Sequence, residues 1–124
     1  MTKKILIVED EEDILDLLST IFDDHANYES LYARDGEEAL RITRADNPDI
    51  ILLDIQLPKL NGHEVCKSVK SDPATSRTKV LILSGMAQKS DWLKAREAGA
   101  DDYVSKPFGS NALVEKVEAL LRSN

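Results

Sequence analysis

Polar side chains that could bind a metal ion and an anion stand at the ends of four short apolar segments. Glu9 and Asp10 follow the first of these segments, Asp54 follows another, and Ser84 and Lys106 close two more. A carboxylate can ligate Mg²⁺, and it can also act as a nucleophile that forms an aspartyl phosphate. A hydroxyl and an ammonium group suit the oxygens of an arriving phosphoryl group. These residue types predict metal-assisted phosphoryl transfer, provided that the chain brings the segment ends together.

Electrostatic repulsion indicates why such a cluster needs a cation. Two carboxylates about 4 Å apart repel by roughly 4 kcal/mol at an effective dielectric constant near 20. The single charge of Lys106 cannot cancel three carboxylates, whereas a divalent ion can. We therefore predict that Glu9, Asp10 and Asp54 bind Mg²⁺ (or Mn²⁺). With the metal on one side and Lys106 and Ser84 on the others, Asp54 is the predicted phosphoryl acceptor.

The apolar segments themselves have the length and composition of β-strands. Residues 5–8, 50–53 and 80–83 are apolar throughout and rich in β-branched side chains, as in strands buried on both faces of a parallel sheet. A weaker strand is expected at residues 103–104. Residues 28–33 mix polar and apolar side chains, which is typical of an edge strand.

Helical patterns lie between the predicted strands. Apolar residues from Ile14 to Phe22 and from Leu113 to Leu121 recur at the spacing of one helix face, the second set after a possible N-cap at Ser110. Weaker helices are expected at residues 37–44, 63–69 and 90–98, with Gly99 ending the last. Alternating strands and helices predict an α/β fold, a doubly wound five-stranded parallel sheet. In such sheets ligands bind beyond the carboxyl ends of the strands, which is where the polar residues stand.

Composition limits the classes of function. The 124 residues are expected to form one domain, residues 1–124, and the net charge of −7 argues against direct binding of nucleic acid. No apolar run reaches the length of about 20 residues that a membrane span needs, so no membrane insertion is expected. Cys66 is the only cysteine, which is simplest in a reducing cytoplasm, and we expect it to be a small buried side chain rather than a reactive thiol.

Each candidate residue also has an ordinary structural interpretation. Glu11, Glu12 and Asp13 are better explained as acids that favour a helix N-terminus. Taken alone, Asp54 could cap a turn and Ser84 could be a loop hydroxyl. Their joint placement at four strand ends favours the functional interpretation.

The single tryptophan and the two histidines lie outside the cluster. Trp92 could anchor a partner or pack against the sheet, and the sequence favours neither. His25 and His63 are expected to be surface histidines rather than ligands.

The order and spacing of four segments resemble the receiver domain of two-component response regulators, of the chemotaxis-regulator-like single-domain type. These segments are ILIVEDEED, DIILLDIQLPKLNG, LILSG and AGADDYVSKPF, and the resemblance covers essentially the whole chain. It implies a flavodoxin-like (βα)5 fold with strand order 2-1-3-4-5.

The resemblance also implies individual roles around the metal. Asp54 matches the phosphorylated aspartate, and Glu9 and Asp10 match the acidic pair that binds the metal with it. The backbone carbonyl of Gln56 matches a further metal ligand. Gly62, together with Pro58, matches the loop after the phosphorylation site.

Further positions match the residues that respond to phosphorylation. Ser84 resembles the switch hydroxyl, although many relatives have threonine there, and Lys106 resembles the lysine that contacts the phosphoryl group. Tyr103 resembles the aromatic switch residue. By resemblance, the peptide bond before Pro107 is expected to be cis.

The implied function is a phosphoacceptor switch in a phosphorelay, which catalyses only its own phosphorylation and dephosphorylation. The donor would be a sensor histidine kinase or phosphotransfer protein, and the output would leave through the face formed by the helix near residues 90–98, the strand near 103–104 and the last helix. The downstream effector is not specified, and a monomer or a phosphorylation-dependent dimer is expected.

Three other classes remain as alternatives to the switch. A phosphatase would place a second acid where Gln56 stands, and a flavin or nucleotide site would be repelled by residues 9–13. A scaffold without signalling chemistry would not need the complete set of polar residues.

Overall fold

The computed structural model describes residues 2–24, 27–55, 61–85, 89–106 and 108–122. Five parallel strands form one sheet in the order β2-β1-β3-β4-β5, which confirms the predicted fold class and strand order. The strands are β1 (Lys3–Val8), β2 (Tyr28–Ala33), β3 (Ile50–Asp54), β4 (Lys79–Ser84) and β5 (Asp102–Ser105). The helices are α1 (Glu12–Asp23), α2 (Gly36–Asp46), α3 (Gly62–Ser71), α4 (Lys89–Glu97) and α5 (Ser110–Arg122).

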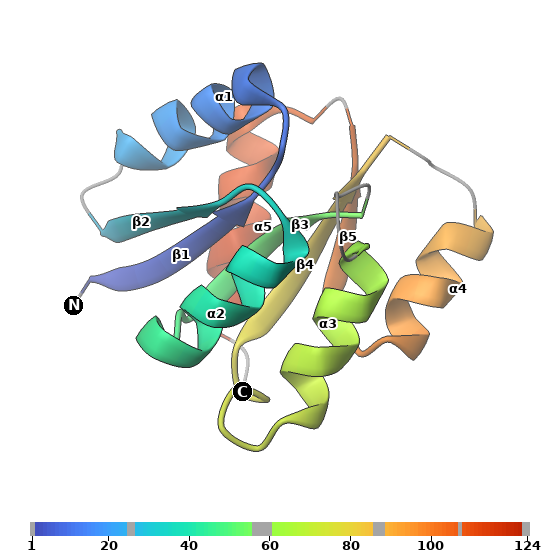
Figure 1. Cartoon of the computed structure of the whole chain (residues 1–124). Coiled ribbons are helices and arrows are strands. Elements are labelled where there is room, and N and C mark those ends of the chain that lie inside the picture. Colours follow the sequence, from blue (N-terminus) through green and yellow to red (C-terminus); the bar gives the residue numbers. More distant parts are fainter. Residues whose placement is uncertain (1, 25–26, 56–60, 86–88, 107, 123–124) are drawn as a thin grey trace.

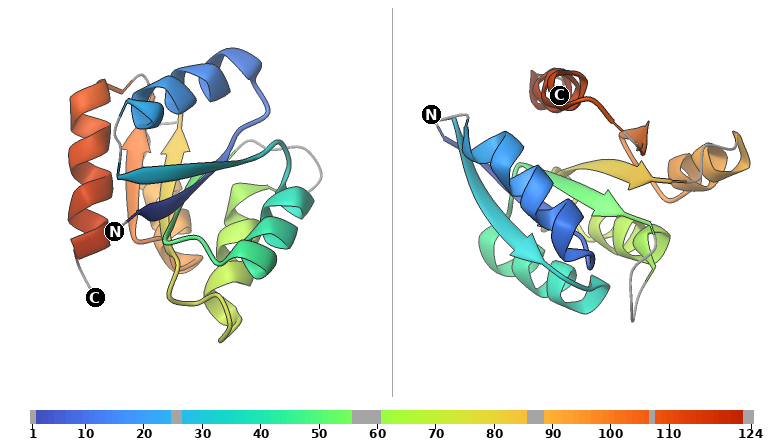
Figure 2. Two further views of the ribbon diagram at one scale, coloured as in Figure 1. Left: turned by 90° about the vertical axis from the view of Figure 1, so that its left-hand side faces the viewer. Right: turned by 90° about the horizontal axis from the view of Figure 1, so that it is seen from above.

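Helices cover both faces of the sheet. Helices α1 and α5 lie on one face, and α2, α3 and α4 lie on the other (Figure 1). The view from above in Figure 2 separates the two layers most clearly. Alternate residues of β1 and β3 enter opposite cores: Ile5 and Ile50 pack with α1 and α5, whereas Leu6 and Ile51 pack on the other side. The two cores explain why the central strands are apolar throughout.

The edge strand predicted at residues 28–33 is confirmed over its full length, and the other four predicted strands were correct in place but too short at their ends. Strand β1 begins at Lys3 rather than at residue 5, because Lys3 and Lys4 pair with Tyr28 and Glu29 of the edge strand. An apolar run indicates which residues are buried, whereas a strand extends for as long as its backbone is paired with a neighbouring strand. None of the described helices is long and apolar enough to cross a bilayer.

Local signals fix where two of the helices begin. The Asp35 carboxylate accepts a hydrogen bond from the backbone N–H of Glu38 at 2.8 Å, at the start of α2. The side chain of Asn61 accepts from the N–H of Glu64 at 3.0 Å and donates to its carboxylate at 2.9 Å, at the start of α3. This reciprocal cap fixes where α3 begins, after the segment of residues 55–61 that follows β3.

Candidate functional site

The register of the sheet brings the polar strand ends to one edge. Val8 of β1 lies beside Leu53 of β3, so Glu9 and Asp54 each come one residue further along neighbouring strands. Ser84 pairs with Ser105 in the next two strands, and the backbone N–H of Lys106 donates to the Ser84 carbonyl at 2.7 Å. The predicted convergence of Glu9, Asp54, Ser84 and Lys106 therefore follows from the pairing of adjacent parallel strands.

Three carboxylates gather at this edge. Oxygens of Glu9, Asp10 and Asp54 all lie within 4.8 Å of one another. Glu9 is 1% exposed and Asp54 is 4% exposed, whereas Asp10 is open to solvent. An all-oxygen set of this kind, with one open member, suits a hard divalent cation such as Mg²⁺. The residues present thus fit the metal that the sequence predicted.

Lys106 reaches into the same cluster. Its Nζ lies 3.2 Å from Oε2 of Glu9, to which it donates a hydrogen bond, and 3.4 Å from Oδ2 of Asp54. The other Glu9 oxygen, Oε1, accepts a hydrogen bond from the backbone N–H of Glu11 at 3.3 Å. One ammonium group therefore serves two buried carboxylates.

The charges perturb the acid–base properties of both partners. The pKa of Glu9 is raised from 4.5 to about 7, chiefly by burial and next by the nearby Asp54 carboxylate, while Lys106 acts in the opposite direction. Burial lowers the pKa of Lys106, but the charges of Asp54 and Glu9 outweigh this effect and the pKa is raised overall. Burial and a neighbouring carboxylate both disfavour the charged form of Glu9, and the ammonium of Lys106 offsets them only in part. A bound divalent cation would supply the missing positive charge.

Ser84 and Tyr103 lie on the β4 and β5 side of the cluster. Ser84 is buried at the end of β4. Tyr103 is half-buried in the core beneath α2, α3 and α4, and its ring meets Trp92 of α4 edge-on, with centroids 5.7 Å apart. Trp92 thus packs against the sheet, which was one of its two interpretations, and its use as a partner anchor stays a prediction.

Several predicted residues fall elsewhere. Gln56, Pro58 and Pro107 lie outside the described residues, so the metal-binding carbonyl and the cis peptide bond stay predictions, and His25 also lies outside. His63 is half-buried at the start of α3, and its assignment as a surface histidine rather than a ligand stays a prediction.

The expectation for Cys66 is confirmed. The side chain is fully buried, and burial raises the pKa of its thiol to about 12. A buried thiol with so high a pKa is a packing residue.

A close contact at Gly62 was not foreseen from the sequence. A Cβ atom on this residue would lie 2.7 Å from the carbonyl oxygen of Asp54 and 2.7 Å from Cα of Ile55. The backbone N–H of Gly62 donates to the Ile55 carbonyl at 2.8 Å. Helix α3 therefore begins directly against the backbone that carries Asp54, and the glycine is needed because both neighbours are backbone atoms.

Comparison with known proteins identifies the class. Residues 5–118 match the family model described as "Response regulator receiver domain", and the chain belongs to this family. Receiver domains are the phosphoacceptor switches of two-component response regulators, phosphorylated on aspartate. They bind Mg²⁺ at an acidic pocket and interact with histidine kinases or phosphotransfer proteins.

The curated relatives that resemble this chain are of two lengths. Over 98% of its length the chain is 41% identical to the alkaline phosphatase synthesis transcriptional regulatory protein PhoP of Bacillus subtilis, of which it covers 50%. It is 36% identical to the polar-differentiation response regulator DivK of Brucella ovis, and 98% of each protein is covered. The chain thus spans about half the length of some curated relatives and nearly all of others.

Solved structures agree with the assignment. A putative response regulator from Chloroflexus aurantiacus superposes with a TM-score of 0.94 at 33% identity, covering 99% of this chain and 100% of the other. The chemotaxis response regulator CheY4 of Vibrio cholerae gives a TM-score of 0.90 at 28% identity, covering 97% and 99%.

Proposed function

We propose that Asp54 is the residue that accepts the phosphoryl group, and that Glu9, Asp10 and Asp54 hold one Mg²⁺ (or Mn²⁺) beside it. The observation that carries this proposal is the shared ammonium group. Lys106 Nζ lies 3.4 Å from Asp54 and 3.2 Å from Glu9, within a cluster of three acids. Within this cluster the Asp54 carboxylate can act as nucleophile through one oxygen, while the carboxylates of Glu9 and Asp10 help to bind the cation.

The chemistry divides among the residues as follows. When bound, the cation would neutralise negative charge on the phosphoryl oxygens. A carboxylate oxygen of Asp54 attacks phosphorus, the bond from phosphorus to the imidazole nitrogen of a phosphohistidine breaks, and that nitrogen keeps the electron pair. Lys106 gives up part of its contact with the carboxylates and contacts one oxygen of the transferred phosphoryl group. The Ser84 hydroxyl donates a hydrogen bond to another of these oxygens. The carbonyl of Gln56 would complete the metal ligands, as the resemblance implies.

The same residues would govern the lifetime of the product. Asp54 is 4% exposed, so few directions are open for water to approach the acyl phosphate. We propose that the chain catalyses its own phosphorylation and dephosphorylation and turns over no separate substrate. Multiple turnovers on a generic phosphate monoester would instead support a phosphatase.

Phosphorylation would act by biasing two shapes of the domain. New contacts from Ser84 and Lys106 to the phosphoryl group favour one shape over the other. Ser84 ends β4, and the Tyr103 ring on the adjacent strand contacts Trp92 of α4. The output surface would therefore be the face formed by α4, β5 and α5.

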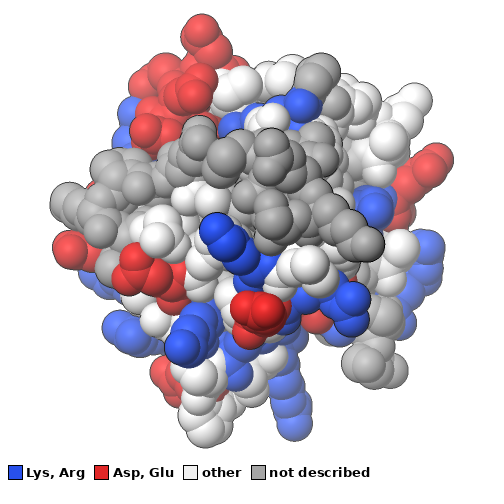
Figure 3. All heavy atoms as spheres, turned by 90° about the vertical axis from the view of Figure 1, so that its right-hand side faces the viewer, with Lys and Arg blue, Asp and Glu red and all other residues white. Residues whose placement is uncertain are grey.

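Charge is divided unevenly between the two halves of the chain. Residues 1–61 contain 15 acidic and 6 basic residues, whereas residues 62–124 contain 8 acidic and 10 basic residues. Lys and Arg side chains gather on the lower part of the α4 side (Figure 3). We propose that residues 1–124 act as one receiver domain, that the donor is a sensor histidine kinase or phosphotransfer protein, and that the output involves no direct contact with nucleic acid.

Phosphorylation with a small donor tests the assignment. The protein is incubated with Mg²⁺ and acetyl phosphate, and its intact mass is measured. The mass should increase by one phosphoryl group, and the increase should disappear in Asp54→Ala and in EDTA. Asp23→Ala, which changes an exposed acid at the end of α1, is the matched control and should label normally. Equal labelling of Asp54→Ala would place the acceptor elsewhere.

A further inference from the structure

The C-terminal end of α4 is tied to α3 and β4 by a group of charged and backbone contacts at the opposite edge of the sheet from the acids. Lys70 of α3 pairs with Asp101, with Nζ 2.8 Å from Oδ2, and also donates to the Thr78 carbonyl at 2.7 Å. The same Asp101 oxygen accepts the backbone N–H of Val80 at 2.8 Å. We call Lys70, Asp101 and these two backbone groups the Lys70 clasp. It joins α3, the start of β4 and the turn between α4 and β5.

The turn held by the clasp is itself closely bonded. The N–H groups of Gly99 and Ala100 donate to the carbonyls of Arg96 and Ala95, both at 3.0 Å, which is the double hydrogen bond of a Schellman motif. Gly99 has φ +97°, and a Cβ there would lie 3.0 Å from Cγ of Lys70. The Lys70 side chain thus lies against the turn as well as pairing with it.

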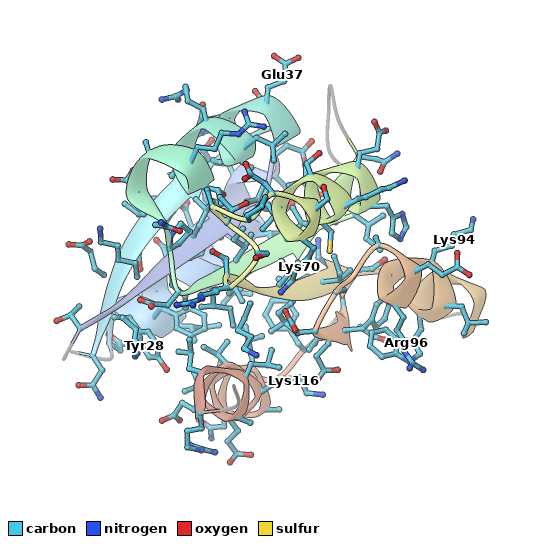
Figure 4. The ribbon with its side chains drawn as sticks, turned by 90° about the horizontal axis from the view of Figure 1, so that it is seen from below. Tyr28, Glu37, Lys70, Lys94, Arg96 and Lys116 are labelled. Carbon is cyan, nitrogen blue, oxygen red and sulfur yellow. The ribbon has the colours of Figure 1, made fainter. Side chains whose placement is uncertain are left out.

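Two further contacts act on the same turn. The N–H of Asp101 donates to the Val80 carbonyl at 2.9 Å, and the Cys66 thiol donates to the Ala98 carbonyl at 3.4 Å. The N–H of Ala98 donates to the Lys94 carbonyl at 3.1 Å, so the backbone N–H groups of residues 98–101 are all hydrogen-bonded, with three of their partners in α4 and one on β4. Figure 4, viewed from below, shows Lys70 near this end of the sheet, while Lys94 and Arg96 extend from opposite sides of α4.

The rest of α4 is attached more lightly. Among the α4 side chains that the structure describes, Ala95 alone is fully buried, and Leu93 is 47% exposed. Trp92 is half-buried, with its contact to Tyr103 on one side and the Arg96 guanidinium 5.9 Å above its ring. Toward the site, β4 ends at Ser84, and a Cβ on the following Gly85 would have no neighbour within 4 Å.

We propose that the Lys70 clasp makes the C-terminal end of α4 a fixed pivot, about which the N-terminal part of the helix turns when Asp54 is phosphorylated. This inference rests on the proposed phosphoacceptor function. Movement of Ser84 acts at the end of β4, from which the chain leads to the start of α4. Because the far end of the helix is held by α3 and the start of β4, the displacement is largest near the start of α4 and small at residues 98–101. Lys70 and Asp101 are thus positioning residues that convert a shift at Ser84 into a rotation of the helix past Tyr103.

Hydrogen–deuterium exchange of the full chain tests the pivot. Three proteins are compared with wild type: Lys70→Met, which keeps an unbranched side chain but removes the ammonium, Asp101→Asn, and Lys116→Met as control. Lys116 also forms an ion pair with β5, 3.2 Å from Asp102, but does so from α5. Each is measured without donor and during labelling with Mg²⁺ and acetyl phosphate, and intact mass reports phosphorylation separately.

Without donor, exchange at residues 98–101 should rise about tenfold in Lys70→Met, because a charge-assisted bond on a part-buried turn is lost. It should rise less in Asp101→Asn, which retains an acceptor for Val80, and stay within about twofold of wild type in Lys116→Met. On phosphorylation, wild type should change at residues 89–93 and not at 98–101. In Lys70→Met the change should extend through 98–101.

Two results would overturn the pivot while the phosphoacceptor function stands. One is normal phosphorylation with equal exchange changes at 89–93 and 98–101 in wild type. The other is Lys70→Met with the same exchange at 98–101 as wild type. Failure of every protein to label would instead overturn the phosphoacceptor function, and the proposed motion with it.

Discussion

Replacing Lys106 by methionine would remove the one ammonium group that two buried carboxylates share, while keeping an unbranched side chain of similar length. At an effective dielectric constant of about 20, an ammonium at 3.2 Å from Glu9 and 3.4 Å from Asp54 attracts each by about 5 kcal/mol before desolvation. Breaking a buried pair by removing one partner usually costs about 3–5 kcal/mol. We expect a smaller loss at low pH, since Glu9 can escape its unfavourable charge by binding a proton.

The pH dependence follows from the pKa of Glu9, raised from its ordinary value of 4.5 to about 7. The folded state therefore binds this proton more tightly than the unfolded state does, and without metal the associated stability is present below pH 4.5 and lost as the pH rises through 7. In Lys106→Met the pKa rises further, so the loss continues above pH 7. One pH unit corresponds to about 1.4 kcal/mol. The variant should lose about 2–3 kcal/mol at pH 6 and about 1.4 kcal/mol more at pH 8.

Urea unfolding followed by circular dichroism, in EDTA and in Mg²⁺, measures both effects. Mg²⁺ stabilises the folded state according to its affinity, and it should stabilise Lys106→Met more than wild type because the Lys106 ammonium no longer competes for the carboxylates. Lys70→Met is the matched control, since Lys70 has the same 19% side-chain exposure and pairs with Asp101 at 2.8 Å, away from the acids. It should lose stability equally at pH 6 and 8, without extra recovery in Mg²⁺. An equal loss for Lys106→Met at both pH values, or weaker stabilisation by Mg²⁺ than in wild type, would refute this reasoning.

Other predictions concern the backbone beside Asp54, the buried thiol and the switch hydroxyl. Gly62→Ala should lower the free energy of unfolding, measured by urea denaturation, by about 2 kcal/mol, because its Cβ would meet backbone atoms at 2.7 Å. Gly109→Ala, whose Cβ would have nothing within 4 Å, should show no such loss. Cys66 should react with iodoacetamide at pH 8 about a hundredfold more slowly in the native protein than in urea. Because burial raises the pKa of the thiol from 9.0 to about 12, its contribution to the stability of the folded protein should be complete below pH 9 and be lost as the pH rises through 12. Comparable rates in both conditions would contradict the burial. Ser84→Ala should still label with acetyl phosphate but show less than half of the exchange change at residues 89–93, and an unaltered change would remove the hydroxyl from the switch.

Much of the site could be predicted from the sequence because parallel strands place their carboxyl ends together. Once residues 5–8, 50–53 and 80–83 are interpreted as neighbouring strands, the meeting of Glu9 with Asp54 follows from the register. The resemblance to receiver domains added the order of the strands. Neither argument needs a measured distance.

The contacts that no pattern signalled are those between segments far apart in the chain. Lys70 and Asp101 are 31 positions apart, and the sequence presents each as an ordinary surface charge. Gly62 matched a loop by resemblance, but its contact with the Asp54 backbone depends on where α3 begins relative to β3. Distances and burial at these points arise from packing of helices on the sheet, which periodicity does not specify.

Chemical trapping of the phosphorylated residue tests the central claim most directly. Sodium borohydride reduces an acyl phosphate to the alcohol, so an aspartyl phosphate becomes homoserine, which tandem mass spectrometry locates in a peptide. After labelling with Mg²⁺ and acetyl phosphate, we predict homoserine at position 54 and at no other aspartate. Homoserine at another acidic residue, or a phosphoryl group that survives borohydride, would contradict the account.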